Sequence, residues 1–122
     1  MSAIQERRGH VRAEIRWPIV LLTNRGAIVG ETINIGVNGA FIFCQEPLQE
    51  KEQLRLFIMA PDRQPLSLPV EVTWSNPHPS AVDFPPRGMG VRFKEISDQD
   101  QKFISKLVAG VANKEIRNIP YD

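Results

Sequence analysis

Strict alternation of apolar and polar residues is the feature that most restricts how this chain can fold. It is clearest over residues 66–75, where apolar side chains recur at every second position with mostly polar ones between them. Successive side chains of a β-strand point to opposite faces, so this pattern predicts a strand that is buried on one face. Shorter runs of the same kind complete the expected set of strands: residues 13–22, 27–35, 40–44, 54–59, 66–75 and 89–93.

Turn signals separate these runs. Asn24-Arg25-Gly26 predicts a hairpin between the first two strands, and Asn38-Gly39 predicts a turn before the third. Pro18 has no backbone N–H, so we expect an edge or a bulge in the first strand at that point. Residues 76–87 contain four prolines, which cannot serve a central strand ladder, and this segment is predicted to be a long loop.

The pattern changes to a helical period near the C-terminus. Ser97 is a favourable N-cap residue, and Asp100 three positions later is placed to complete a capping box. The apolar residues that follow form one stripe: Phe103, Ile104, Leu107, Val108, Val111 and Ala112. We expect this stripe to close one end of the β structure. Six short strands and one terminal helix predict an all-β barrel or a closed sandwich with a helical plug.

Length, charge and cysteine content restrict the class of function. The 122 residues suffice for one domain, and a net charge of +1 argues against a generic binder of nucleic acid or membranes. The single cysteine, Cys44, cannot form an internal disulfide, which favours a reducing compartment. With His10 and His78 it follows no metal-ligand spacing.

The sequence also contains no sign of membrane insertion or catalysis. No apolar run approaches the roughly 20 residues that a membrane helix needs. The N-terminus has no apolar core of a signal peptide. No nucleophile motif, phosphate loop or metal cluster is present. We therefore expect a cytoplasmic protein that is not an enzyme, has no cofactor and does not bind DNA or RNA.

The N-terminal residues differ from the rest of the chain. Residues 1–12 are polar and basic without periodicity, which predicts a flexible arm before a folded unit of residues 13–116 and a tail of residues 117–122. The arm contains two arginines four positions apart, Arg8 and Arg12. A basic tail in solvent would be enough to account for them.

A second reading joins the arm to the segment Asn34–Gly39 in a pocket for a planar, anionic ligand. The fork of an arginine pairs with a phosphate or a guanine edge, and its flat face stacks on a base. Asn34 can bond a base edge or cap the local turn. Gly36 and Gly39 allow the backbone to approach a ligand closely or to adopt a positive φ. By itself, however, the segment is better explained as a turn that joins two strands and binds nothing.

The order of these motifs resembles that of the PilZ family of cyclic di-GMP receptors. That family has an Arg-x-x-x-Arg pair just before its first strand, which Arg8 and Arg12 match. It has an [Asp/Asn]-x-Ser-x-x-Gly motif some 20 residues later, which Asn34 and Gly39 match at its two ends. The segment Gly88–Phe93 is similar to the family's Gly-x-Gly-Val-basic-Phe strand. The resemblance extends from about residue 6 to about residue 112.

The resemblance implies a fold and a ligand. The fold is a six-stranded antiparallel β-barrel with a C-terminal α-helix packed on it, and cyclic di-GMP binds to its outer surface. Arg8 and Arg12 would hold guanine edges and phosphates, and Asn34 with the backbone of residues 36–39 would hold the other side. An extra basic residue before the arginine pair, here Arg7, implies two stacked ligand molecules. The expected ligand-binding residues are Arg7, Arg8, Arg12, Asn34, Gly36, Asn38 and Gly39.

The chain departs from the family pattern at Gly36, where the family has serine. Loss of a hydroxyl contact is worth about 1 kcal/mol, or several-fold in affinity. The expected function is a receptor that orders its arginine arm over the nucleotide and so regulates an unidentified downstream protein. The alternative is a PilZ-like interaction module that no longer binds the nucleotide. A barrel that binds single-stranded nucleic acid is disfavoured by the near-neutral charge.

Other residues are given structural roles. Trp17 and Trp74 are expected to lie in the core, because both fall in apolar runs of predicted strands. His10 is expected to be a spacer within the arm, and Arg92 a solvated charge on a strand.

Overall fold

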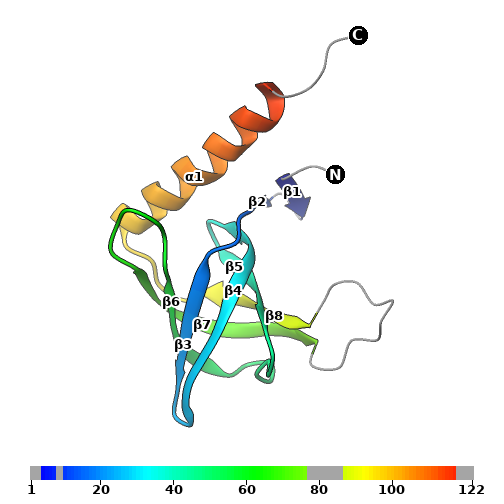
Figure 1. Ribbon diagram of the computed structural model, residues 1–122, viewed down its shortest axis with the longest axis vertical. Helices are drawn as coiled ribbons and strands as arrows, with labels where there is room; N and C mark the ends of the chain where they lie inside the picture. The colour runs from blue at the N-terminus through cyan, green and yellow to red at the C-terminus, as the bar shows by residue number, and fades with distance from the viewer. Residues whose placement is uncertain (1–3, 8–9, 77–86, 118–122) are drawn as a thin grey trace.

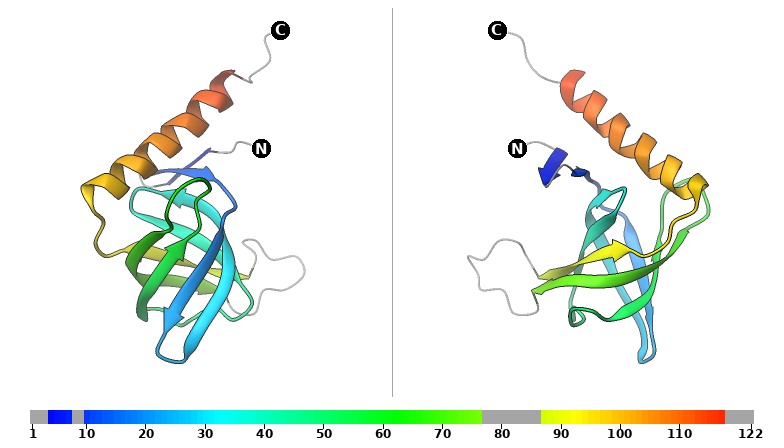
Figure 2. Two further views of the ribbon diagram at one scale, coloured as in Figure 1. Left: turned by 60° about the vertical axis from the view of Figure 1, so that its left-hand side comes forward. Right: turned by 180° about the vertical axis from the view of Figure 1, so that it is seen from behind.

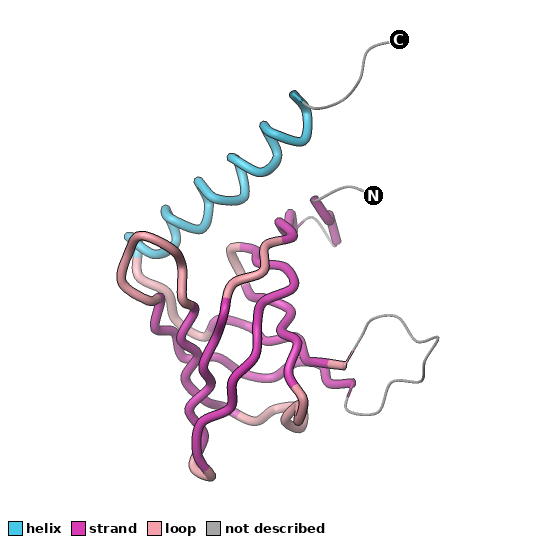
Figure 3. Tube along the Cα trace, in the orientation of Figure 1, coloured by secondary structure: helices cyan, strands magenta, loops and turns pink. Residues whose placement is uncertain are grey.

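A computed structural model of the chain describes residues 4–7, 10–76 and 87–117 (Figure 1). In these ranges the chain forms mostly β-strands, with helix only near the C-terminus (Figure 3). The elements, in chain order, are β1 Ile4–Arg7, β2 His10–Glu14, β3 Pro18–Thr23, β4 Gly26–Gly36, β5 Gly39–Cys44, β6 Gln53–Ile58, β7 Leu66–Asn76, β8 Gly88–Phe93 and α1 Asp98–Arg117.

Six of the strands close into a barrel. They follow the order β4-β3-β6-β7-β8-β5, and β5 then pairs with β4, so that each strand has a neighbour on both sides. All of these pairings are antiparallel, which confirms the predicted six-stranded antiparallel barrel. Closure removes the unpaired strand edges that would otherwise bind other chains. The expected loop at residues 76–87 lies largely outside the described residues.

The core of the barrel is formed by the inward-facing half of each alternating strand. On β7, for example, Leu66, Leu68, Val70 and Val72 are all at most 1% exposed. Two strands change phase along their length, because the register shifts between Thr32 and Asn34 on β4 and between Val72 and Trp74 on β7. Such β-bulges turn the residues beyond them to the opposite face.

The N-terminal segment has more regular structure than predicted. Residues expected to form an irregular arm make the hairpin β1–β2, and β2 pairs with β4 over Arg12↔Gly36, Ala13↔Ile35 and Glu14↔Asn34. The physical reason is that β2 obtains its backbone partners from a strand 20 to 24 residues away. A local search for periodicity cannot detect such a partner.

The first predicted strand, residues 13–22, is divided into β2 and β3 by a break at residues 15–17. Thr32, fully buried on β4, spans this break. Its Oγ1 accepts a hydrogen bond from the Trp17 N–H at 2.9 Å and donates one to the Ile15 carbonyl at 2.5 Å. The predicted irregularity at Pro18 is therefore present, and Pro18 begins β3.

Helix α1 lies across one end of the barrel beside the N-terminal hairpin (Figure 2). The Ser97 Oγ accepts a hydrogen bond from the Asp100 N–H at 3.1 Å, which confirms the predicted N-cap. Ile104 and Val108 are buried in the core, as the apolar stripe predicts. The Asp100 carboxylate pairs with Arg63 at 3.4 Å, and the Arg63 guanidinium also lies 4.3 Å from the centre of the Phe103 ring. These contacts attach the start of the helix to the β6–β7 connection.

Candidate functional site

The arginine motif, through Arg12, meets the motif of residues 34–39 where β2 pairs with β4. Arg12 lies directly opposite Gly36, and Glu14 lies opposite Asn34. Ala13, between them, points into the core and is fully buried. Its neighbours Arg12 and Glu14 therefore face outward, on the same side of the sheet as Asn34. The fold brings the second arginine of the first motif beside the first residue of the second motif.

A hydrogen bond joins these two motifs directly. The Arg12 Nη1 donates to Asn34 Oδ1 at 3.2 Å, across 22 positions of sequence. Asn34 is only 4% exposed, although the β4 bulge turns it to the outer face, opposite Phe41 of β5. A bond in this partly buried setting restricts both side chains, so the guanidinium of Arg12 is held in place on the barrel surface.

Of the other arginines predicted to bind the ligand, Arg7 is the last residue of β1 and pairs with His10 across the turn of the hairpin. Arg8 lies outside the described residues. The position of Arg7 in the hairpin places its backbone on the segment that leads to Arg12. His10, expected to be a spacer, is the first residue of β2.

The turn between β4 and β5 holds the remaining predicted residues. Gly36 is buried at the end of β4, and Asn38 is exposed in the turn. The Asn38 carbonyl accepts a hydrogen bond from the Phe93 N–H at 2.9 Å. A Cβ at Gly39 would lie 2.2 Å from the Val91 carbonyl oxygen. The absence of a side chain at Gly39 is thus explained by close packing against β8.

An outward-facing aromatic pair, which the sequence did not predict, extends the same outer face. Asn34, Phe41, Gly90 and Trp74 lie opposite one another in a row across β4, β5, β8 and β7. The Phe41 and Trp74 rings meet edge to face, with centroids 5.5 Å apart. Trp74 is 38% exposed, so its predicted place in the core is wrong. The β7 bulge after Val72 turns it outward.

The charge near this row is partly neutralised. Arg92 lies opposite Gly39 on one side and Glu71 on the other, and its Nη2 pairs with the Glu71 Oε1 at 2.6 Å. Its side chain remains 53% exposed, in agreement with the predicted solvated charge. Arg92 is thus held by Glu71 rather than by the residues of the two motifs.

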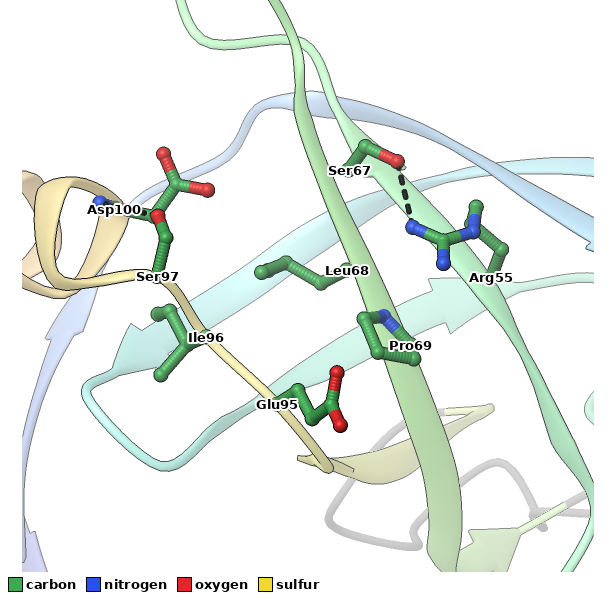
Figure 4. Close-up of a pocket in the computed structure, with 8 residues that line it drawn as sticks. All are labelled: Arg55, Ser67, Leu68, Pro69, Glu95, Ile96, Ser97 and Asp100. Carbon is green, nitrogen blue, oxygen red and sulfur yellow. Dashed lines mark hydrogen bonds between the residues drawn. The ribbon is translucent and has the colours of Figure 1, made fainter.

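A separate hollow of about 560 Å³ lies between β6, β7 and the segment that joins β8 to α1 (Figure 4). Arg55, which donates a hydrogen bond to Ser67 at 2.9 Å, stands at one side of it, and Glu95 and Asp100 stand at others. It shares no residue with the predicted ligand-binding set. It is open and mixed in polarity, whereas the motif residues lie on an outer barrel surface, so we regard the motif surface as the candidate site.

Other kinds of site are not found in the part of the chain that the structure describes. No group of three metal-ligating side chains occurs among residues 4–7, 10–76 and 87–117. In the same ranges no helix is long and apolar enough to cross a membrane. Cys44 is a buried free cysteine, and burial raises the pKa of its thiol, which keeps it protonated and unreactive.

Comparison with known proteins gives one family and several related structures. A family model described as a PilZ domain matches residues 6–110. No curated protein matches the chain. The solved PilZ domain of YcgR from Escherichia coli with c-di-GMP superposes with a TM-score of 0.69 at 10% identity, covering 94% of this chain and 100% of that one.

Two further structures extend the likeness. The inhibitor of motility MotI/DgrA from Bacillus subtilis gives a TM-score of 0.65 at 19% identity, covering 94% of this chain and 54% of that one, so the match is to about half of that protein. The PilZ domain of CeSA from a cellulose-synthesizing bacterium gives 0.54 at 20% identity, covering 83% and 97%. At these identities the structures show a shared fold. The family match, which includes both motifs and all six barrel strands, shows that the chain belongs to the PilZ domain family.

Proposed function

We propose that this protein is a cyclic di-GMP receptor that binds the nucleotide on the outer face of the barrel, where β2 meets β4. The observation that carries the proposal is the 3.2 Å hydrogen bond from Arg12 to Asn34, because it unites the two sequence motifs in one site. Members of the PilZ family are cyclic di-GMP receptor domains and typically not enzymes. The YcgR structure with c-di-GMP has the same fold.

Each motif residue has a role in this proposal. Arg8 and Arg12 bond guanine edges and phosphates, for which a planar guanidinium is well suited. Because Asn34 already orients Arg12, less conformational entropy is lost when the ligand binds. Asn34 and the backbone of residues 36–39 contact the other side of the ligand, with Asn38 exposed in the turn.

The aromatic pair suggests an addition to this set. Phe41 and Trp74 lie in one row with Asn34, separated from each other by Gly90, which has no side chain to cover them. The exposed Trp74 lies on the same outer face of the sheet as Arg12 and Asn34, three strands beyond Asn34, and it offers a surface against which a guanine base can pack. We include Trp74 in the proposed site for that reason.

The signalling part of the proposal concerns the hairpin β1–β2. Arg7 in this hairpin contacts a second, stacked nucleotide, so two ligands bind to each protomer. The bound nucleotide holds the hairpin to the barrel, changes the exposed surface and thereby alters the affinity for a downstream protein in the cytoplasm. Among structural relatives, one is named an inhibitor of motility.

Calorimetric titration with cyclic di-GMP tests the proposal. We expect saturable binding by the wild type, and a loss of roughly 10- to 100-fold in affinity for Arg12→Ala, since hydrogen bonds to charged groups contribute about 1.5–3 kcal/mol. Arg16→Ala is the matched control: Arg16 is nearby and exposed, but it pairs with Glu31 at 2.8 Å. Arg7→Ala should lower the stoichiometry from two to one.

Gly36 favours a second candidate function, an interaction module that has lost nucleotide binding. The family serine is absent at this position, so one side-chain donor is missing. In that case the wild type would give no heat and no shift in melting temperature at high ligand concentration. Replacement of Arg8 and Arg12 by alanine would leave binding to its protein partner unchanged. The absence of nucleotide binding would refute the receptor proposal, and unchanged partner binding by the alanine variant would support the interaction module.

A further inference from the structure

A second surface of the barrel, which shares no residue with the proposed nucleotide site, is unusually apolar. On the outer face of β6, β3 and β4, Phe57, Val20 and Val29 lie opposite one another and form a central row. The row on one side consists of Arg55, Leu22 and Ala27, because Leu22 pairs with both of the other residues. The row on the other side is Met59, Pro18 and Glu31, since the Met59 N–H bonds the Pro18 carbonyl and Pro18 pairs with Glu31. We call these nine residues the β3 face.

The β3 face differs from other outer faces of the same barrel. On β7 the outward positions are Ser67, Pro69, Glu71, Thr73 and Trp74, of which three are polar. On the β3 face seven of the nine residues are apolar. Val29 is 72% exposed and Leu22 47%, and these are two of the three large apolar side chains exposed in the described part of the chain. The β3 face therefore has a larger share of apolar residues than the outer face of β7.

No described helix or strand lies over the β3 face. Helix α1 and the hairpin β1–β2 lie at the end of the barrel, and the left view of Figure 2 looks onto uncovered β3, β4 and β6. Three strands about 4.8 Å apart and three rows about 6.8 Å apart give an area of roughly 300 Å². A patch of this size is comparable with the largest apolar patch of a typical monomer, which is often functional.

The two charged residues of the β3 face occupy opposite corners. Glu31 is at one end of β4's row and Arg55 is at the diagonally opposite position on β6. Arg16 pairs with Glu31 through the carboxylate oxygen Oε1, and Arg55 is bonded to the hydroxyl of Ser67. Both charged groups lie on the exposed side of the sheet, so opposite charges at matching positions of a partner would add to the contacts with Arg16 and Ser67.

We propose that this partner is a second copy of the chain, joined through the β3 face by a two-fold axis. A two-fold interface must be self-complementary. An axis that lies in the face and passes through Val20, perpendicular to the Glu31–Arg55 diagonal, places Glu31 of each copy over Arg55 of the other. The same operation places Val20 on its own counterpart and brings Val29 of one copy to Leu22 of the other. Both the charges and the apolar rows are thereby matched.

The small area indicates a weak dimer. Even with its rim, the face buries less than the roughly 800 Å² per partner of a standard stable interface. We therefore expect dimers with a dissociation constant in the micromolar range, independent of cyclic di-GMP. Sedimentation velocity on the full chain from about 5 to 500 μM should show a concentration-dependent shift from monomer to dimer.

Single substitutions test whether the β3 face is the surface through which the dimer forms. Val29→Glu places a charge in the central row and should raise the dissociation constant at least tenfold. Thr73→Glu, at an exposed position on β7, is the matched control and should leave it unchanged. Melting temperatures of both variants verify that the barrel remains folded.

A charge exchange gives the sharper test. Glu31→Arg alone places two arginines opposite each other across the interface, and Arg55→Glu alone places two glutamates opposite each other. Each single substitution should therefore weaken the dimer. The double variant should restore it to within a few-fold of wild type. A wild type that stays monomeric up to about 500 μM would overturn the proposal, even if the β3 face then proved to bind another protein. So would a dimer that is unaffected by Val29→Glu or not restored by the double exchange.

Discussion

Replacement of Thr32 by valine tests how the N-terminal hairpin is held to the barrel. Thr32 is fully buried on β4, and its hydroxyl bridges the break between β2 and β3 through the Trp17 N–H and the Ile15 carbonyl. Valine has nearly the same shape and favours strands, but it can neither donate nor accept a hydrogen bond. The substitution therefore removes both bonds with little change in packing.

The expected loss of stability follows from the two backbone groups left behind. Each hydrogen bond contributes about 0.5–1.5 kcal/mol, and a buried group left without a partner costs about 1–3 kcal/mol. Since the Ile15 carbonyl belongs to a half-buried residue that water can partly reach, we expect a total of about 2–3 kcal/mol. For a chain of 122 residues this lowers the melting temperature by about 10 °C.

Urea unfolding followed by tryptophan fluorescence measures the free energy of unfolding, with linear extrapolation to water. Thr32→Ser is the control, because it keeps the hydroxyl and loses one buried methyl, worth about 1 kcal/mol. The valine variant should be less stable than the serine variant. If the valine variant lies within about 0.5 kcal/mol of wild type, or above the serine variant, Thr32 does not hold the junction.

Three further predictions follow from single positions. Gly39→Ala should lower the free energy of unfolding by more than about 2 kcal/mol, because the new Cβ would lie 2.2 Å from the Val91 carbonyl oxygen. Gly110→Ala is the contrast: its Cβ would meet nothing within 4 Å, so it should raise the free energy of unfolding by about 0.5–1 kcal/mol in the same assay. Gly36→Ser should tighten cyclic di-GMP binding several-fold by calorimetry, and a loss of affinity would contradict the assigned role of this position. Burial raises the pKa of the Cys44 thiol above its value in the unfolded chain. The stability that the neutral thiol contributes is therefore complete at pH values below the ordinary thiol pKa, and it is lost as the pH rises through the pKa of the folded state. Unfolding curves at increasing alkaline pH, with Cys44→Ala as the comparison, measure this; a slope that is identical in the two proteins would argue against it.

Most of the barrel could be predicted because alternation with period two is a local property of the sequence. The buried residues Leu66, Leu68, Val70 and Val72 on β7 followed directly from it. The same rule failed two positions later at Trp74, because the β7 bulge reverses the phase of the strand. A bulge depends on how the neighbouring strand is paired, and one sequence alone does not reveal this.

The candidate site was predicted in composition but not in geometry. The residue types at Arg12 and Asn34 indicated a ligand for arginine and amide groups, and the fold brings them within 3.2 Å. What the sequence could not show is that they are joined by pairing of β2 with β4. The β4 bulge, which turns Asn34 outward, and the β7 bulge, which turns Trp74 outward, place both residues in one row. The site therefore depends on two interruptions of the pattern that predicted the fold.

The way in which β2 joins the sheet separates the stability of the hairpin from that of the barrel. Strands β2 and β3 pair with the same edge of β4, one after the other, while β5 occupies its other edge. The ring of six strands is therefore already complete without β1 and β2. If the hairpin detaches, β4 loses three paired positions and, among residues 12–14, whose burial is described, the barrel loses the buried side chain of Ala13, but no strand of the ring loses both neighbours. Opening of the hairpin is thus a local event with its own small free energy, and amide hydrogens of residues 10–14 should exchange well before those of β6 and β7.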